Sequence, residues 1–203
     1  MYNSEQHYNH LYSTVPREFE FCAENEEELT NWQEAFRDRL RQALGLHNIE
    51  MDLSHHQPKA EMLKSEDMGD HIREEWYLWV EPTVPLPFYL LRPKEHNKGL
   101  PLALTPHGHS HPHIYVGIAN NQKEEEEITE GERDIACQAV RQGYLTIAPT
   151  TRAFGETRTT IDRNNDKGNS CRTALMHGLL VGRTPIGERV WDMSRLIDWA
   201  IAE

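Results

Sequence analysis

The chain has 203 residues, a length that predicts a single domain on the usual prior of roughly 100 to 200 residues per domain. Lys and Arg total 21 against 33 Asp and Glu, so the formal net charge is −12. Such a charge repels phosphate backbones, so we expect no nucleic-acid partner, and a neutral or cationic substrate is easier to accommodate. The hydrophobic share of 37% is modest, which fits a small or incomplete core.

Three widely spaced cysteines, Cys22, Cys137 and Cys171, carry information on the compartment. An odd number without a Cys-x-x-Cys pair predicts neither a disulfide framework nor a thiolate metal clip. The N-terminus lacks the cationic and then apolar pattern of a signal peptide, and no stretch approaches about 18 apolar residues. We therefore expect a soluble, cytoplasmic protein with reduced thiols and no membrane partner.

The first strong element is a helix from about Glu24 to Leu44, where apolar residues recur every three or four positions. Gly45 is expected to end it. We interpret residues 1–45 as an N-terminal helical extension of a single domain, 1–203. Residues 47–70 are polar and are expected to be irregular.

Four short β-rich runs follow. Glu75 to Val80 and Leu86 to Leu91 are separated by a proline-containing turn and predict an antiparallel hairpin. Proline cannot donate to a central ladder, so we expect this hairpin at the edge of a sheet. Leu100 to Thr105 and Tyr144 to Ala148 are short and apolar, as strands buried on both faces would be.

A helix predicted from Gly131 to Gln142 separates the last two strands at the spacing of a right-handed parallel crossover. Further helices are expected at Ser170 to Val181 and Gly187 to Ala202. The sequence therefore predicts an α/β fold with a mostly parallel sheet, an antiparallel N-terminal edge hairpin and flanking helices. The last helix should bury one apolar stripe, and since no further strand is predicted to receive it, we expect a C-terminally incomplete architecture. The stripe consists of Val190, Met193, Ile197 and Ile201.

Four stretches, in order and with characteristic spacing, form a recognisable pattern. They are Pro87 to Pro93, Leu104-Thr-Pro-His-Gly-His109, Ala148 to Glu156, and Asn169 to Arg172 continued by Gly187 to Asp192. The pattern resembles the N-terminal two-thirds of α/β-hydrolases of the acetyl xylan esterase and dienelactone hydrolase-like group, and it extends over about Glu18 to Glu203.

The resemblance implies a partial α/β-hydrolase fold and a carboxylic-ester hydrolase that uses a serine, an acidic residue and a histidine base, in that chain order. It implies a small-molecule or carbohydrate ester as substrate and no cofactor. No Gly-x-Ser-x-Gly occurs between Met1 and Glu203, so no catalytic residue is assigned in this chain. We expect the chain to be inactive alone.

The apolar run that stops at His107 and Gly108 resembles the strand and loop that build half of an esterase oxyanion hole. The resemblance places the backbone N–H of His109 as one donor to the oxyanion, which can contribute ~3–4 kcal/mol to catalysis. His107, Gly108, Arg152 and Glu156 would border the substrate cleft. Arg152 and Glu156 could instead pair with each other.

The loop from Arg152 to Glu156 resembles the one that leaves the corresponding strand in these hydrolases. Gly155 would allow a backbone conformation that a side chain hinders. Ala153 departs from the glycine often found at its position.

Alternate residues from His107 to His113 are histidines, which supports a competing hypothesis. On an extended segment they would share one face and could bind zinc or nickel. The chain would then be a noncatalytic metal-binding or interaction module, and a homo-oligomer covering an open sheet edge is compatible with either hypothesis. Gly108 and Pro112 favour a loop and no acidic residue lies among the histidines, so we expect no metal site.

Cys171 follows Asn169 and Ser170 at a predicted helix start, where a thiol pKa can fall. A catalytic thiolate is conceivable there. No histidine is identifiably paired with it, so a packed cysteine is the preferred interpretation.

Overall fold

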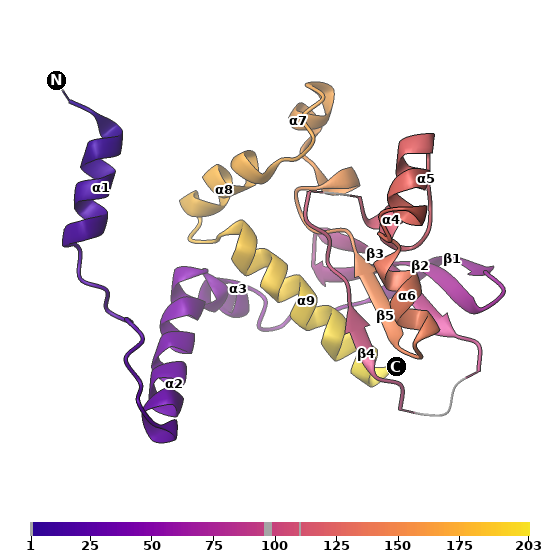
Figure 1. Cartoon of the computed structure of the whole chain (residues 1–203), viewed down its shortest axis with the longest axis horizontal. Helices are drawn as coiled ribbons and strands as arrows, with labels where there is room; N and C mark the ends of the chain where they lie inside the picture. The colour runs from indigo at the N-terminus through magenta and orange to yellow at the C-terminus, as the bar shows by residue number, and fades with distance from the viewer. Residues whose placement is uncertain (1, 96–98, 110) are drawn as a thin grey trace. The chain divides into compact units, whose positions relative to one another are not determined.

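A computed structural model describes residues 2–95, 99–109 and 111–203 of the chain (Figure 1). The chain divides into two compact units, Met1–Ala43 and Leu44–Glu203. Within the described residues, no helix combines the length and the apolar content needed to cross a lipid bilayer.

The first unit contains α1 (Ser4–Thr14) and α2 (Glu26–Ala43), joined by an extended segment. Phe19 and Phe21 from that segment contact α2, where the rings of Trp32 and Phe36 stack with centroids 4.9 Å apart. The Trp32 indole N–H donates to the carbonyl of Phe19 at 3.2 Å. The helix predicted at Glu24 to Leu44 is confirmed as α2, whereas α1 was not predicted.

The second unit is built on a sheet whose five strands, within the described residues, run in the order β1-β2-β3-β5-β4. Its strands are β1 (Ala60–Asp67), β2 (His71–Glu81), β3 (Val84–Pro93), β4 (Leu102–Leu104) and β5 (Leu145–Pro149). β4 and β5 are parallel, as the predicted crossover requires, but the other three pairs are antiparallel. The α/β class is therefore confirmed, and the expectation of a mostly parallel sheet is matched only in part.

The sheet is more antiparallel than predicted because β5 runs antiparallel to β3 and because β1 adds an antiparallel pair with β2. β1 lies in the segment expected to be irregular. β1 is charged and mostly exposed, so it carries no apolar alternation that would mark it as a strand. Its partner β2 supplies the fully buried apolar residues of the pair, such as Leu78.

β3 does not lie at an edge, since β2 and β5 pair with its two sides. The ladder between β3 and β5 extends only from Leu91 to Phe88. Pro87 comes next, and its carbonyl accepts from the Thr150 N–H at 2.8 Å. Its proline nitrogen therefore faces the β5 side, just where that ladder ends, and no hydrogen bond to β2 is lost.

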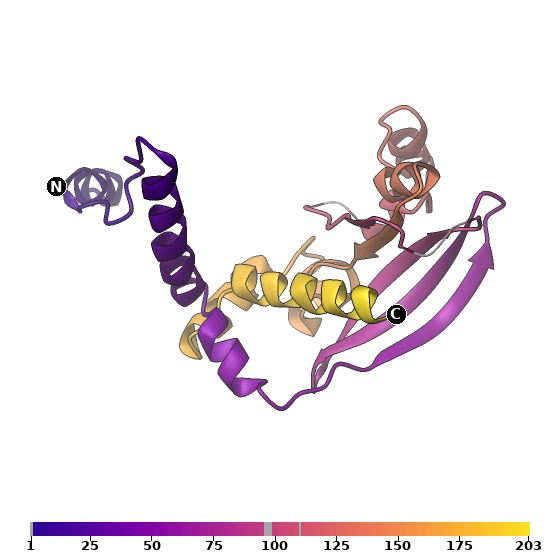
Figure 2. The ribbon, with the colours of Figure 1, turned by 90° about the horizontal axis from the view of Figure 1, so that it is seen from below.

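Helices cover both faces of the sheet, as Figure 2 shows for the yellow α9 and the pink to orange α4–α6 region. Along β3 and β5 successive side chains point to opposite faces. Leu90 and Ile147 join the core beneath α9, whereas Leu91 and Ala148 join the core beneath α6. The helices of this unit are α3 (Leu46–Asp52), α4 (Pro112–Tyr115), α5 (Gln122–Thr129), α6 (Ile135–Arg141), α7 (Thr160–Asn164), α8 (Cys171–Leu180) and α9 (Pro185–Ala202), with a 3-10 turn at Gly155–Thr157.

The buried face of α9 differs from the predicted stripe. Ile197 and Ile201 are exposed, whereas Trp191 and Leu196 are buried against β2 and β3. The indole N–H of Trp191 donates to the Val80 carbonyl at 3.0 Å, which fixes the rotation of the helix. β4 is likewise only half-buried rather than buried on both faces, because β5 is its sole neighbour among the described strands.

Two adjacent residues of α9 test which face is buried. Leu196→Ala should lower the free energy of unfolding by roughly 2–5 kcal/mol, because Leu196 is fully buried and the substitution leaves a cavity. Ile197→Ala is the matched control and should lower it by less than about 1 kcal/mol, since its side chain is 38% exposed. Urea denaturation of both variants measures the difference. Equal losses would contradict the observed rotation of α9.

Candidate functional site

The loops that follow β4 and β5 form the candidate site. Because these strands are parallel, their carboxyl ends lie at the same edge of the sheet. The Thr105 N–H donates to the Ile147 carbonyl at 2.9 Å and continues the ladder past the end of β4. The two loops therefore leave the sheet side by side.

His107 joins the two loops. Its ring is buried, and its Nε2 accepts from the backbone N–H of Thr151 at 3.0 Å. The Thr151 hydroxyl donates to the His107 carbonyl at 3.1 Å, so side chain and backbone are both held. Because Nε2 accepts, the proton of the neutral ring lies on Nδ1, which contacts the Gly108 carbonyl at 2.9 Å.

His109, the predicted oxyanion donor, lies at the surface with Gly108. Its ring packs edge-on against Phe154 with centroids 5.2 Å apart. Within the described residues no acceptor binds the backbone N–H of His109. Ser110, which follows it in the sequence motif, lies outside the described residues.

The loop after β5 has the special backbone that the sequence indicated. Gly155 has φ +49°, which confirms the expected role of a glycine at this position. Ala153 has φ +71°, a left-handed conformation that costs a residue with a side chain roughly 1–2 kcal/mol. The Ala153 carbonyl accepts from the Ser170 N–H at 2.8 Å, and Arg189 donates twice to the Arg152 carbonyl. These contacts hold the strained loop in place.

Arg152 does not pair with Glu156. It makes a bidentate pair with Asp192 at 2.7 and 2.6 Å and lies 2.6 Å from Glu81. Glu188 follows at 3.6 Å. The guanidinium is thus committed to acidic residues of β2 and α9, which makes Arg152 a positioning residue of the loop.

The charges of this network are strongly coupled. Burial raises the pKa of Asp192 to about 6, although Arg152 acts in the opposite direction. Burial would lower the pKa of Arg152, but the carboxylates around it, with Asp192 first, raise it above its ordinary value. Burial alone would raise the pKa of Glu81, but Arg152 and Arg183 lower this pKa below its ordinary value. Arg152 therefore stays charged.

Cavities adjoin the loops. Arg152 and Glu156 line a cavity of 440 Å³ beside the start of β3. Glu156 also lines a second cavity, of 220 Å³. His109 lines a third, of 370 Å³, with residues of α5. The structure thus brings Arg152 and Glu156 to one cavity and places His109 at another. His107 lies beneath the surface and Gly108 lies beside His109.

The four histidines do not gather around one point. His107 turns inward to Thr151, while His113 contacts Glu124 at 3.1 Å and its ring stacks on that of His111. Pro112 begins α4, so the segment is not extended. Among the described residues, no group of three or more His, Cys, Asp or Glu side chains could hold a metal ion.

Cys171 begins α8 and is half-buried. Its sulfur lies 3.3 Å from Nη2 of Arg189, whose guanidinium also lies over the Phe154 ring. No histidine contacts it within the described residues. The contacts are those of a packed thiol, as the sequence favoured.

Sequence reasoning missed the partners that hold the site. Thr151, Glu81 and Asp192 lie at least 40 positions from the residues they contact, so no local spacing marks them. Thr151, Arg189 and Asp192 lie in stretches that carry the family resemblance, but that resemblance gave them no role.

No protein-family model matches the chain, and no curated protein matches it in sequence. In structure it is similar to a candidate acetyl xylan esterase from Bacteroides fragilis NCTC 9343, with a TM-score of 0.73 and 19% identity, over 100% of this chain and 51% of that chain. It is less similar to methylesterase BT1017, with a TM-score of 0.48 and 16% identity, over 66% of this chain and 27% of that chain. The chain thus spans about half the length of the first of these proteins. The first likeness shows that the chain shares the fold of about half of that esterase, as the sequence resemblance predicted.

Removing Asp192 tests whether Arg152 depends on it. Asp192→Ala should lower the free energy of unfolding at pH 7 by roughly 3–5 kcal/mol, because it removes one partner of a buried ion pair. Asp198→Ala, which breaks an exposed pair with Arg195, is the control and should cost less than about 1 kcal/mol. Urea denaturation compares the two. A loss at Asp192 no larger than at Asp198 would contradict the role given to the buried pair.

Proposed function

We propose that the chain supplies the oxyanion half of a carboxylic-ester hydrolase of the α/β-hydrolase type, acting on small-molecule or carbohydrate esters. One observation carries the proposal. The backbone N–H of His109 has no acceptor within the described residues and sits on a loop fixed by His107 at the carboxyl end of a parallel strand pair. A preorganised backbone donor at such an edge is what an oxyanion hole requires.

The proposed roles follow from these positions. His109 donates its N–H to the oxygen that becomes negative when the ester carbonyl is attacked. His107 and Gly108 shape the loop at the mouth of the cleft. Glu156 and Arg152 border the neighbouring cavity of 440 Å³, and Arg152 acts through the loop and not by contact with the ester.

The nucleophile, the acid and the base are assigned to residues outside these 203, because no Gly-x-Ser-x-Gly occurs among them. In the reaction, the serine oxygen bonds to the carbonyl carbon and its proton passes to the base. The carbonyl π electron pair moves to the oxygen bound by His109 and returns as the bond to the alcohol oxygen breaks, and the base gives its proton to that oxygen. Water then attacks the acyl-serine in the same way and releases the acid. The present residues supply binding and charge stabilisation in this scheme.

The cysteines bear on the compartment of the protein, and the open edge of the sheet bears on its assembly. The three cysteines are free, which fits a reducing compartment, and we infer a cytoplasmic location. The open edge of β4 could pair with a strand of another segment or of a second copy of the chain. No observation on the described residues favours the metal-binding alternative.

A pair of substitutions at one position tests the oxyanion role. The chain is fused ahead of the second half of the Bacteroides esterase, and hydrolysis of p-nitrophenyl acetate is measured. His109→Pro removes the backbone N–H and should lower kcat by roughly 10²–10³-fold. His109→Ala keeps the N–H and is the matched control, with kcat close to that of the parent fusion.

The 203-residue chain assayed alone completes the test. It should not turn over the ester, and circular dichroism should show the same fold for the two His109 variants. Hydrolysis by the chain alone, or equal kcat for the two variants, would contradict the proposal.

A further inference from the structure

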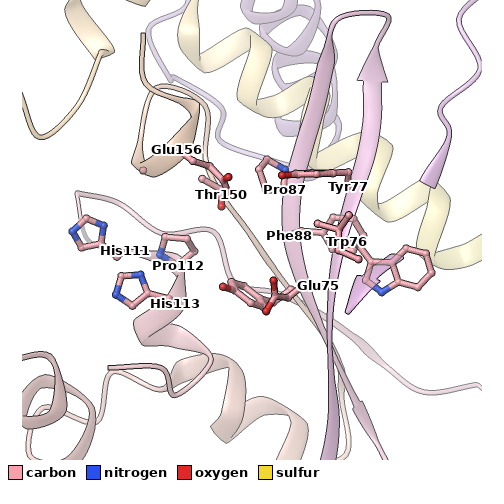
Figure 3. Close-up of a pocket in the computed structure, with 13 residues that line it drawn as sticks. Glu75, Trp76, Tyr77, Pro87, Phe88, His111, Pro112, His113, Thr150 and Glu156 are labelled. Carbon is pink, nitrogen blue, oxygen red and sulfur yellow. The ribbon is translucent and has the colours of Figure 1, made fainter. Parts of the chain in front are cut away.

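The cavity of 220 Å³ lies between the face of β2 and β3 and the segment of His111 and His113 (Figure 3). Two strand residues, Glu75 and Tyr77, and Glu156 from the turn after β5 line it. The volume is below the ~300–1,000 Å³ of sites for drug-sized ligands, so the cavity suits a small group. His109 does not line this cavity, although Glu156 also lines the cavity of 440 Å³ assigned above to the ester site, and binding here does not depend on ester hydrolysis.

Two carboxylates face this cavity without a cation. Within the described residues, neither the Glu75 nor the Glu156 carboxylate forms a hydrogen bond or an ion pair; Glu75 is partly buried and Glu156 is exposed. Lys64, the cross-strand neighbour of Glu75, pairs instead with Glu66 at 2.8 Å. Arg73 also pairs with Glu66, at 2.9 Å, and donates to a backbone carbonyl. Within the described part of the chain, no cation therefore pairs with either carboxylate.

Aromatic side chains line the cavity with the two carboxylates. Tyr89 is the cross-strand neighbour of Glu75, and Tyr77 lies on the same face of β2. Burial raises the pKa of both phenols. The negative charge of Glu156 raises the pKa of Tyr77 further, and that of Glu75 raises the pKa of Tyr89 further. Both tyrosines therefore experience the negative field of the carboxylates and stay neutral.

We propose that this cavity binds a small organic cation, such as an alkylammonium or guanidinium group, held between Glu75 and Glu156 and against the rings of Tyr77 and Tyr89. A cation over a tyrosine face is attracted by the ring quadrupole, and unpaired carboxylates add charge attraction. A bare metal ion would bind less well here, because no group of three ligating side chains occurs among the described residues. An anion would be repelled.

Binding of choline chloride to the 203-residue chain tests the proposal. A titration followed by the backbone amide signals of Glu75, Tyr77 and Glu156 is run at constant ionic strength, with NaCl as the balance. These signals should move and saturate. The uncharged isostere 3,3-dimethylbutan-1-ol should bind at least about tenfold more weakly, because it fills the same space without charge.

Variants separate the cavity from the general acidity of the chain. Glu75→Gln combined with Glu156→Gln should weaken choline binding at least about tenfold. Glu34→Gln combined with Glu130→Gln removes the same charge from exposed positions and should leave binding unchanged. Circular dichroism checks the fold of each variant.

Three outcomes would overturn the proposal. They are the absence of a saturable shift with choline, equal affinity for the neutral isostere, and equal loss of binding in the two double variants. Equally strong binding of a neutral methyl glycoside at the same amides would assign the cavity to a sugar hydroxyl ligand and contradict the cation. Since none of these readouts involves ester hydrolysis, they leave the oxyanion proposal unaffected.

Discussion

The pair of hydrogen bonds between His107 and Thr151 is the constraint on which the candidate site depends. It joins the loop after β4 to the loop after β5 through one buried side chain and one backbone carbonyl. Without it, the loop that carries His109 would lose both of these hydrogen bonds to the loop after β5 and would keep its ring contacts with Phe154. A backbone donor stabilises a developing charge only if it is fixed before the charge appears, which gives this buried ring its importance.

The second loop depends on charge rather than on packing alone. Arg152 is held by Asp192 from α9 and by Glu81 from β2, and Arg189 of α9 holds the carbonyl of the same residue. These contacts keep a backbone segment with two left-handed residues in one conformation. The rotation of α9 about its axis therefore places Leu196 in the core and, at the same time, places Asp192 and Arg189 against the loop of Arg152.

The sequence predicted the elements with strong apolar periodicity, and the Leu104 to His109 motif predicted the loop that the structure fixes. It did not predict β1, which is polar, or the central place of β3, where Pro87 escapes the usual penalty because the neighbouring ladder ends there. Nor could spacing predict that Arg152 would bind Asp192 and Glu81 instead of Glu156. Those partners become neighbours only when α9 packs on the sheet, and a local pattern does not encode such contacts.

The protonation of the His107 ring tests the central claim most directly. Long-range proton–nitrogen NMR correlation at neutral pH distinguishes the two neutral tautomers and the doubly protonated ring. The structure predicts a neutral ring with its proton on Nδ1 and a bare Nε2 that accepts from the Thr151 amide. A proton on Nε2 would contradict that hydrogen bond, and with it the fixed geometry of the loop that presents His109.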